Sequence, residues 1–184
     1  ITFPICHCAN SGATAGYPQF AHDMFRPGII MYGIGHQAGQ LGLRPLMTLK
    51  TVVGSVKEFT EGTTISYGRT FRTDRTSRVG VLPIGYADGL HRMLSNKWRV
   101  WTPYGMAPLV GRVCMDMCMI DLTGLPEVKE GDAVEVYGPH NSVNDAAVLA
   151  ETISYELTCA VSKRVPRIYY KNGKEIGREL LLRG

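Results

Sequence analysis

The middle and end of the chain alternate between short apolar runs and turn-forming residues. The runs are rich in Val and Ile, and Gly, Thr and Asp separate them. They are MTLKTVVGSVKEF from residue 47, ISYGRTF from 65, RVGVLPIGY from 78, PLVGRVCMDMCMIDL from 108 and DAVEVYG from 132. Regularly spaced β-like runs punctuated by glycine indicate an all-β barrel or sandwich. From about residue 44 onward, the sequence therefore predicts a mainly β fold.

The first part of the chain has a different pattern. ITFPIC at 1–6 and PGIIMYG at 27–33 are apolar and strand-like, and GATAGYPQFAHDM between them favours a connector with a helical turn. A short helix between two apolar strands predicts parallel pairing. Because two such strands cannot bury both faces of a sheet, we expect the chain to begin partway through a larger α/β unit.

One helix is predicted inside the β region, from Val143 to about Ser162, with Ser142 as its N-cap and Pro166 as its stop. The apolar positions close to the 3.6-residue period are Ala146, Leu149, Ala150, Ile153, Leu157, Ala160 and Val161. Beyond the helix, Asn172 and Gly173 stand between two strand-like runs and predict a hairpin turn.

Composition narrows the class of protein. Apolar residues make up 45% and charged residues 20% of the chain, an ordinary globular balance. The sequence has no apolar run of about 18 residues, so we expect no membrane span, and its start does not resemble a signal peptide. A net charge of +4, spread along the chain, does not favour nucleic-acid binding.

Five cysteines, an odd number, argue against a complete disulfide framework. Cys6 and Cys8, and Cys114 and Cys118, are spaced closely enough for a zinc site to be an alternative. They do not form paired C-x2-C motifs, however, and residues two apart face opposite sides of a strand. We therefore expect buried, reduced thiols, no metal and a cytoplasmic protein.

The stretch VLPIGYADGL, residues 81–90, is the strongest candidate for chemistry. Its apolar run ends at Ile84, and Gly85 and Gly89 bracket Tyr86 and Asp88. Glycines allow the backbone to leave a buried strand sharply and to project a polar side chain at the turn. On pattern alone, a tyrosine packed at a strand end is the alternative interpretation.

IGYADG resembles the stretch that carries the catalytic tyrosine of alanine racemases, the pyridoxal-phosphate enzymes that interconvert L- and D-alanine. Four further stretches match that family in the same order: HCANS at 7–11, RPGI at 26–29, GRVCMD at 111–116 and ISYE at 153–156. The resemblance implies that residues 1–43 are the C-terminal end of a (β/α)8 barrel. Residues 44–184 would be the family's barrel-like C-terminal β domain.

By the same resemblance, several residues bind the cofactor. Ser11, Gly28 and Ile29 would hold its phosphate, and Tyr155 would reach the phosphate or the entrance. Loops after the last strands of such barrels often bind phosphate. Arg26 would face the pyridine nitrogen. Because arginine keeps its proton, the ring nitrogen would stay neutral, which favours reprotonation of the substrate over transamination.

The resemblance also assigns residues around the substrate. Tyr86 would be the acid/base on the L-alanine side, since racemisation needs proton transfer on two opposite faces. Met115 and Asp116 would lie beside the substrate carboxylate, and Arg112 would line the access corridor. Without the resemblance, all of these candidates have ordinary structural interpretations as turn, surface or core residues.

The family's cofactor lysine, in a V-K-A-N-A-Y-G-type stretch, has no counterpart here. The lysines of this chain all stand in unlike contexts: Lys50, Lys57, Lys97, Lys129, Lys163, Lys171 and Lys174. The resemblance therefore covers only the C-terminal half of the family, without most of the barrel. Alone, the chain is expected neither to attach the cofactor nor to racemise alanine.

The family forms a head-to-tail homodimer and supplies D-alanine for peptidoglycan. By analogy, the phosphate-side residues and Tyr155 would serve their own subunit, and Tyr86, Met115 and Asp116 would serve the partner. Other functions remain open: a non-catalytic β-barrel dimerisation module, a serine racemase domain or a small basic nucleic-acid-binding barrel. Tyr155 favours alanine over serine as the substrate.

Overall fold

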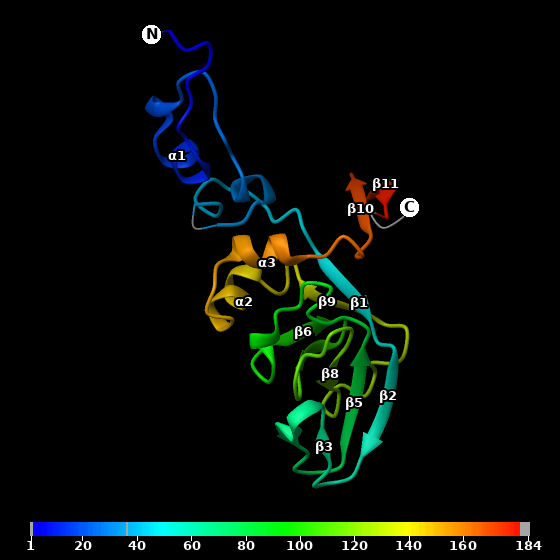
Figure 1. Ribbon diagram of the computed structural model, residues 1–184. Helices are drawn as coiled ribbons and strands as arrows, with labels where there is room; N and C mark the ends of the chain where they lie inside the picture. The colour runs from blue at the N-terminus through cyan, green and yellow to red at the C-terminus, as the bar shows by residue number, and fades with distance from the viewer. Residues whose placement is uncertain (1, 36, 181–184) are drawn as a thin grey trace.

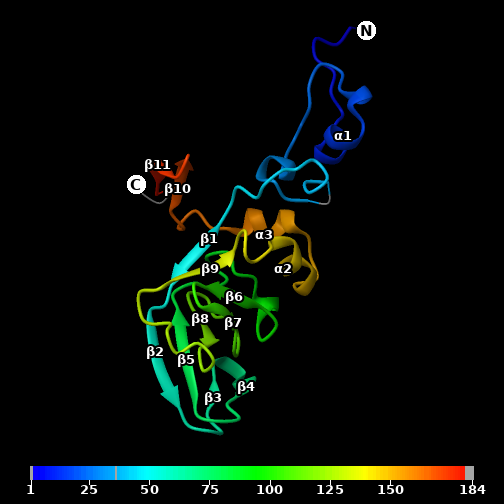
Figure 2. The ribbon, with the colours of Figure 1, turned by 180° about the vertical axis from the view of Figure 1, so that it is seen from behind.

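The computed structural model describes residues 2–35 and 37–180, which fall into four parts (Figure 1). A β body, residues 49–137, carries most of the strands. An N-terminal segment, residues 2–47 with residue 36 outside the description, extends away from it. Two short helices lie between the segment and the body, and a hairpin projects at the side, as both views show (Figures 1 and 2).

The β body consists of antiparallel strands in three sheets. The strands are β1 (Leu49–Val52), β2 (Ser55–Phe59), β3 (Thr64–Ile65), β4 (Phe71–Arg72), β5 (Ser77–Leu82), β6 (Arg99–Thr102), β7 (Gly105–Pro108), β8 (Cys118–Asp121) and β9 (Ala133–Tyr137). The sheet orders are β1-β9-β6-β7, β2-β5-β8 and β3-β4. The mainly β prediction is confirmed.

The barrel-like closure is wrong, because these sheets do not close on one another. The two larger sheets meet through one antiparallel bridge between Leu109 and Ile120. Within the four-stranded sheet, β6 pairs with β9 through Trp101 and Glu135 alone. The β6–β7 hairpin was not predicted from the sequence. Its first strand, β6, has only four residues and ends beside Pro103, so it gives little strand-like signal.

The core fills the space between the two larger sheets. Its fully buried members include Leu82 on β5, Val100 on β6, Ile120 on β8 and Val136 on β9. Trp98 reaches the same core, and its indole Nε1 donates a hydrogen bond to the carbonyl of Val136 at 3.1 Å. Burial of these side chains is the main stabilising contribution to the body.

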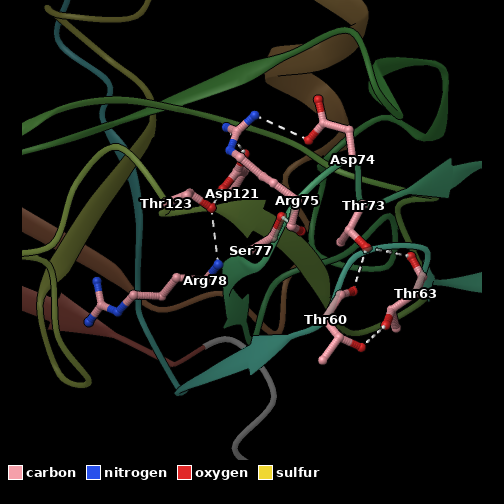
Figure 3. A network of polar contacts seen from close by, with 9 residues as sticks. All are labelled: Thr60, Thr63, Thr73, Asp74, Arg75, Ser77, Arg78, Asp121 and Thr123. Carbon is pink, nitrogen blue, oxygen red and sulfur yellow. Dashed lines mark hydrogen bonds and ion pairs between the residues drawn. The ribbon is translucent and has the colours of Figure 1, made fainter.

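A polar network ties β5 to β8 at the end of the body far from the helices (Figure 3). The Thr123 hydroxyl accepts a hydrogen bond from the Arg78 amide at 3.0 Å and donates one to Asp121 at 2.5 Å. The Arg75 guanidinium lies 3.1 Å from Asp74 and 3.8 Å from Asp121. Arg75 therefore pairs with two carboxylates.

The single helix predicted for residues 143–162 is wrong. The structure has two helices, α2 (Val143–Leu149) and α3 (Ser154–Ala160). Glu151 adopts a left-handed conformation, with φ of 57°, and the Thr152 amide bonds back to the Ala147 carbonyl at 2.9 Å. This is a common way to end a helix. Ile153, assigned to the apolar stripe, is consequently 61% exposed.

Both local turn signals in this region are confirmed. Ser142 is the N-cap of α2, and its hydroxyl accepts a hydrogen bond from the Asn144 amide at 3.2 Å. Asn172 and Gly173, both with positive φ, connect β10 (Arg167–Lys171) to β11 (Lys174–Glu179) as an antiparallel hairpin. Pro166 lies beyond the end of α3, so it does not end that helix.

The N-terminal segment contains α1 (Ser11–Gly16), which confirms the predicted helical turn, and the 3₁₀ turns η1 (Pro18–Phe20) and η2 (Ile29–Tyr32). The two strands predicted at 1–6 and 27–33 are wrong within the described residues. Residues 29–32 form η2 because Gly33 is left-handed and caps a tight turn. Residues 6–9 and 23–26 nevertheless run parallel, since the amides of Asp23 and Arg26 bond to the carbonyls of Cys6 and Ala9.

Two further 3₁₀ turns lie in the body, η3 (Tyr67–Arg69) and η4 (Arg92–Leu94). All five cysteines are free, but only Cys118 is buried, whereas Cys6, Cys8 and Cys159 are exposed; the prediction of buried thiols is wrong for these three. No group of three or more potential metal ligands occurs within residues 2–35 and 37–180. Across the same ranges, each helix is too short or too polar for a membrane crossing.

Candidate functional site

The turn after β5 presents Tyr86 at the surface. Leu82, at the end of β5, and Ile84 are buried, and the backbone then passes close to the loop that precedes β8. The amides of Tyr86 and Ala87 donate hydrogen bonds to the carbonyls of Cys114 and Met115, both at 3.0 Å. Tyr86 itself is 43% exposed, so it is not a core residue packed at a strand end.

Gly85 is required for this close approach. A Cβ at this position would lie 2.3 Å from the carbonyl oxygens of both Cys114 and Met115, far inside van der Waals contact. The turn is then closed by Asp88, whose carboxylate Oδ2 accepts a hydrogen bond from the Gly85 amide at 2.8 Å. The glycine signal read from the sequence thus has a specific cause, which is backbone contact between two loops.

Tyr86 opens into a cleft of about 770 Å³, called here the Tyr86 cleft. Its lining includes Arg112, Met115 and Asp116, so the structure brings together all four residues that the sequence assigned to the substrate. Further lining residues, which the sequence did not single out, are Ser66, Tyr67, Arg92, Val113, Cys114, Met117 and Met119.

The far wall of the cleft is the loop 111–117, which several side chains fix. The Ser66 hydroxyl donates to the Arg112 carbonyl at 2.9 Å. The Asn96 side chain accepts from the Gly111 amide at 2.6 Å, and the Ser95 hydroxyl accepts from the Val113 amide at 3.0 Å. These contacts join segments distant in sequence, so no local pattern could have predicted them.

Arg164, which the sequence did not single out, contacts both loops of the cleft. Its guanidinium pairs with Asp88 at 2.7 Å and with Asp116 at 2.5 Å. The hydrogen bonds that Arg164 donates to Asp88 and then to Asp116 raise the pKa of Arg164 above its already high ordinary value, so the side chain stays charged. The residue sits in the segment that follows α3 and is not among the residues that line the cleft.

A second cavity, of about 300 Å³, lies between the N-terminal segment and the helices α2 and α3; it is called here the Ser11 cavity. Ser11, Ile29 and Tyr155 all line it. Ser11 is 7% exposed, and its hydroxyl accepts a hydrogen bond from the Gly28 amide at 2.7 Å. Gly28 therefore contacts the cavity through Ser11 instead of lining it, while Gly12, not singled out from the sequence, does line it.

Arg26 does not line the Ser11 cavity. It is exposed, its guanidinium Nη2 donates to the Cys8 carbonyl at 3.0 Å, and its amide donates to the Ala9 carbonyl at 2.8 Å. These bonds hold it against residues 8 and 9, just before α1. The described linings of the Tyr86 cleft and the Ser11 cavity have no residue in common, so the candidate residues form two separate groups.

Comparison with known proteins gives consistent matches. The sequence profile described as alanine racemase, C-terminal domain, matches residues 46–169, and that described as alanine racemase, N-terminal domain, matches residues 1–36. Alanine racemase 1 of Clostridium acetobutylicum is 44% identical over 184 residues, which cover 96% of this chain and 48% of that relative. An alanine racemase of Clostridium perfringens is 46% identical over 182 residues, 95% of this chain and 47% of the relative.

Solved structures agree with these matches. Alanine racemase of Clostridium difficile 630, in complex with cycloserine, has a TM-score of 0.91 at 34% identity and covers 99% of this chain and 50% of its own. Alanine racemase of Bacillus anthracis, with bound L-Ala-P, has a TM-score of 0.87 at 34% identity, covering 97% and 48%. The present chain spans about half the length of the curated relatives it matches.

Proposed function

This chain belongs to the alanine racemase family, and we propose that it forms the C-terminal part of a pyridoxal-phosphate-dependent enzyme that interconverts L- and D-alanine. The observation that carries the proposal is the separation of the candidate residues into the Tyr86 cleft and the Ser11 cavity. An active site shared between two subunits needs each subunit to present two such groups, one for its own cofactor and one for its partner's.

The Ser11 cavity fits the phosphate of this cofactor. Its described lining includes hydroxyl and amide side chains, among them Thr152 and Asn144, and no carboxylate that would repel an anion. Because the Ser11 hydroxyl accepts from the Gly28 amide, its own proton is free to be donated into the cavity. Ser11, Tyr155 and the backbone near Gly12 and Ile29 would hold the phosphate. The bound cofactor would supply the electron sink for removal of the substrate's α-proton.

The Tyr86 cleft fits the substrate side of the reaction. Tyr86 would remove or deliver the proton on the L-alanine face of Cα, opposite a lysine of the N-terminal half, because racemisation needs a base on each face. Arg92 and Arg112 line the same cleft and supply positive charge near a phenol that has to lose its proton. Met115 and Asp116 would lie beside the substrate carboxylate.

The assembly that follows is a head-to-tail homodimer, in which the Tyr86 cleft of one subunit completes the site of the other. Residues 1–43 would close a (β/α)8 barrel, with Arg26 at the cofactor's pyridine nitrogen, and residues 44–184 would be the β domain behind it. The free cysteines are compatible with the reducing cytoplasm. The product, D-alanine, would be used for peptidoglycan.

The test compares this chain alone with a full-length polypeptide in which an N-terminal half that contains the cofactor lysine precedes it. Formation of D-alanine from L-alanine is measured by chiral chromatography. We expect racemisation by the full-length polypeptide and none by the chain alone. Racemisation by the chain alone would overturn the proposed division of the site, and a dimer of the full-length polypeptide without activity would favour a non-catalytic dimerisation module.

Substrate choice is tested with the same full-length polypeptide. Tyr155 narrows the Ser11 cavity from α3, and we expect kcat/KM for L-alanine to exceed that for L-serine. A preference for L-serine would instead identify a serine racemase.

A further inference from the structure

Arg164 joins the two loops that form the Tyr86 cleft. Its Nε lies 2.7 Å from Asp88 Oδ1, and its Nη2 lies 2.5 Å from Asp116 Oδ1. Asp88 belongs to the turn that carries Tyr86, whereas Asp116 belongs to the loop that forms the far wall. One planar guanidinium therefore spans two carboxylates from separate loops, an arrangement that a lysine's point charge cannot reproduce.

At the first loop, the carboxylate of Asp88 has two tasks. One oxygen closes the Tyr86 turn by accepting from the Gly85 amide at 2.8 Å, and the other receives the guanidinium of Arg164. The side chain of Asp88 is only 15% exposed, so its charge depends on these donors for compensation. The orientation of the carboxylate that shapes the Tyr86 turn is thus set by Arg164.

At the second loop, Arg164 neutralises Asp116. This carboxylate lines the cleft with its side chain 55% exposed, at the place where an anionic substrate carboxylate is proposed to bind. An unpaired aspartate there would repel the substrate, since like charges at close range disfavour one another. Arg164 does not itself line the cleft, so it acts through Asp88 and Asp116.

The backbone around Arg164 is also packed against the Tyr86 turn, which distinguishes it from an isolated surface ion pair. The Ser162 amide donates to the Asp88 carbonyl at 3.2 Å. Gly89, with φ of 115°, lies so close to Val161 that a Cβ would come within 2.8 Å of the Val161 Cα. Isolated surface ion pairs contribute little because water and side-chain entropy compete with them. Here, backbone contacts already hold the segment that carries Arg164 against the Tyr86 turn, so less entropy is lost when the ion pairs form.

We propose that Arg164 is a positioning residue of the racemase reaction, which fixes the Tyr86 turn against the Asp116 loop and cancels the charge of Asp116. The inference rests on the proposed function for its catalytic consequence. Arg164 lies in the short segment that follows α3, so it also connects the Tyr86 cleft with the helix that carries Tyr155.

The test uses Arg164→Met and Arg164→Lys in the full-length polypeptide, with Arg75→Met as the matched control. Arg75 also pairs with two carboxylates, in the network of Figure 3, but neither it nor its partners Asp74 and Asp121 line either cavity. We expect Arg164→Met to lower kcat/KM for L-alanine about 10- to 100-fold, since small misplacements of catalytic groups have effects of this size. Arg164→Lys is expected to recover only part of the loss, and Arg75→Met to leave kcat/KM unchanged.

A change in isotope effects separates misplacement of Tyr86 from loss of folded enzyme. In Arg164→Met, proton transfer on the L face becomes slower than transfer on the D face. The deuterium isotope effect on kcat/KM should therefore rise for α-deuterated L-alanine and fall for α-deuterated D-alanine. Full recovery by Arg164→Lys would show that charge alone suffices and would overturn the two-carboxylate clamp.

Amide hydrogen exchange of the same polypeptides provides a measurement that needs no activity. We expect exchange at Gly85, Tyr86 and Ala87 to become about tenfold or more faster in Arg164→Met, and to stay unchanged in Arg75→Met. Unchanged exchange, kcat/KM and isotope effects would reduce Arg164 to an ordinary ion pair. If the unsubstituted full-length polypeptide did not racemise alanine, the proposed function would fail, and amide exchange would still decide the structural part of the proposal.

Discussion

The Tyr86 cleft and the Ser11 cavity are built in different ways. The walls of the cleft are loops of the β body, joined by backbone hydrogen bonds from Tyr86 and Ala87 to the opposite loop. The Ser11 cavity lies between the N-terminal segment and α2–α3, and among the described residues no hydrogen bond joins these two walls. They meet through apolar packing, in which Ile29 and Ile34 join the same core as Ala147.

This difference indicates how each site depends on the rest of a full-length protein. Directional bonds within the β body fix the Tyr86 cleft without help from the N-terminal segment. Apolar packing is less specific about geometry, so the Ser11 cavity depends more on the surrounding barrel that a full-length racemase would supply. Substitutions in one site should therefore leave the other largely unaffected. Of the four substitutions that follow, Tyr86→Phe and Ser11→Ala test this independence, and Gly85→Ala and Tyr137→Phe test the packing on which it depends.

Tyr86→Phe is expected to have the largest effect. Removal of an acid/base group costs about 10²- to 10⁴-fold in rate, so kcat of the full-length polypeptide should fall by that factor. The midpoint of thermal unfolding should not change, because the side chain is 43% exposed and no described residue hydrogen bonds with its hydroxyl. Cofactor affinity, measured by titration, should not change either. Wild-type activity in Tyr86→Phe would remove the tyrosine from the chemistry.

Gly85→Ala should break the cleft itself. The new Cβ would meet the carbonyl oxygens of Cys114 and Met115 at 2.3 Å, so the two loops have to separate. We expect a loss of about 2–4 kcal/mol in the free energy of unfolding, measured with urea. Gly124→Ala is the control, because a Cβ there meets no atom within 4 Å. Equal stability of the two variants would show that the loops are not in rigid contact.

The Tyr86 cleft also shows how far the sequence alone could lead. Gly85 and Tyr86 were predictable because a strand that ends in glycines is a local signal, and the motifs of the resemblance marked the opposite loop. Arg164 was not predictable, because its partner Asp88 lies 76 residues away and nothing near either residue announces the pair. The contact exists only once the β body has folded.

The misses elsewhere have a similar origin. Ile153 fits an apolar helical stripe by spacing, but the left-handed Glu151 ends α2 first, and periodicity carries no information about such a turn. Residues 29–32 are apolar and strand-like, but a strand needs a neighbouring strand to pair with. The described part of the N-terminal segment has none, and these residues form η2 instead. Local propensity failed where tertiary partners, present or absent, decide the conformation.

Ser11→Ala tests the second site. It removes the acceptor for the Gly28 amide and a hydroxyl donor in the cavity. We expect cofactor affinity of the full-length polypeptide to fall about tenfold, as the loss of one hydrogen bond to a charged group predicts. Ser95→Ala is the matched variant, because the Ser95 hydroxyl also accepts a hydrogen bond from a backbone amide, that of Val113 in the loop that forms the far wall of the Tyr86 cleft. If both variants weakened cofactor binding equally, the two sites would not be independent.

Tyr137→Phe should have the smallest effect, and it probes the apolar packing that joins the two regions. Tyr137 ends β9, just before α2, and lines a small cavity of about 110 Å³ together with Gly33 and Ile34 of the N-terminal segment. Its hydroxyl is fully buried and has no hydrogen-bond partner among the described residues. At neutral pH, its removal should leave the free energy of unfolding unchanged or raise it by up to about 1 kcal/mol.

The difference between wild type and Tyr137→Phe should then grow with pH. Burial raises the pKa of Tyr137, so above pH 10 or so the unfolded chain loses a proton that the folded chain retains. Stability is therefore lost as the pH rises, by about 1.4 kcal/mol per pH unit, and the Tyr137→Phe substitution removes this slope. Burial also raises the pKa of Cys118, so the stability of Tyr137→Phe still declines at high pH, but less steeply than that of the wild type. Urea unfolding from pH 7 to 11 measures both slopes, and parallel curves would mean that the phenol reaches water in the folded state.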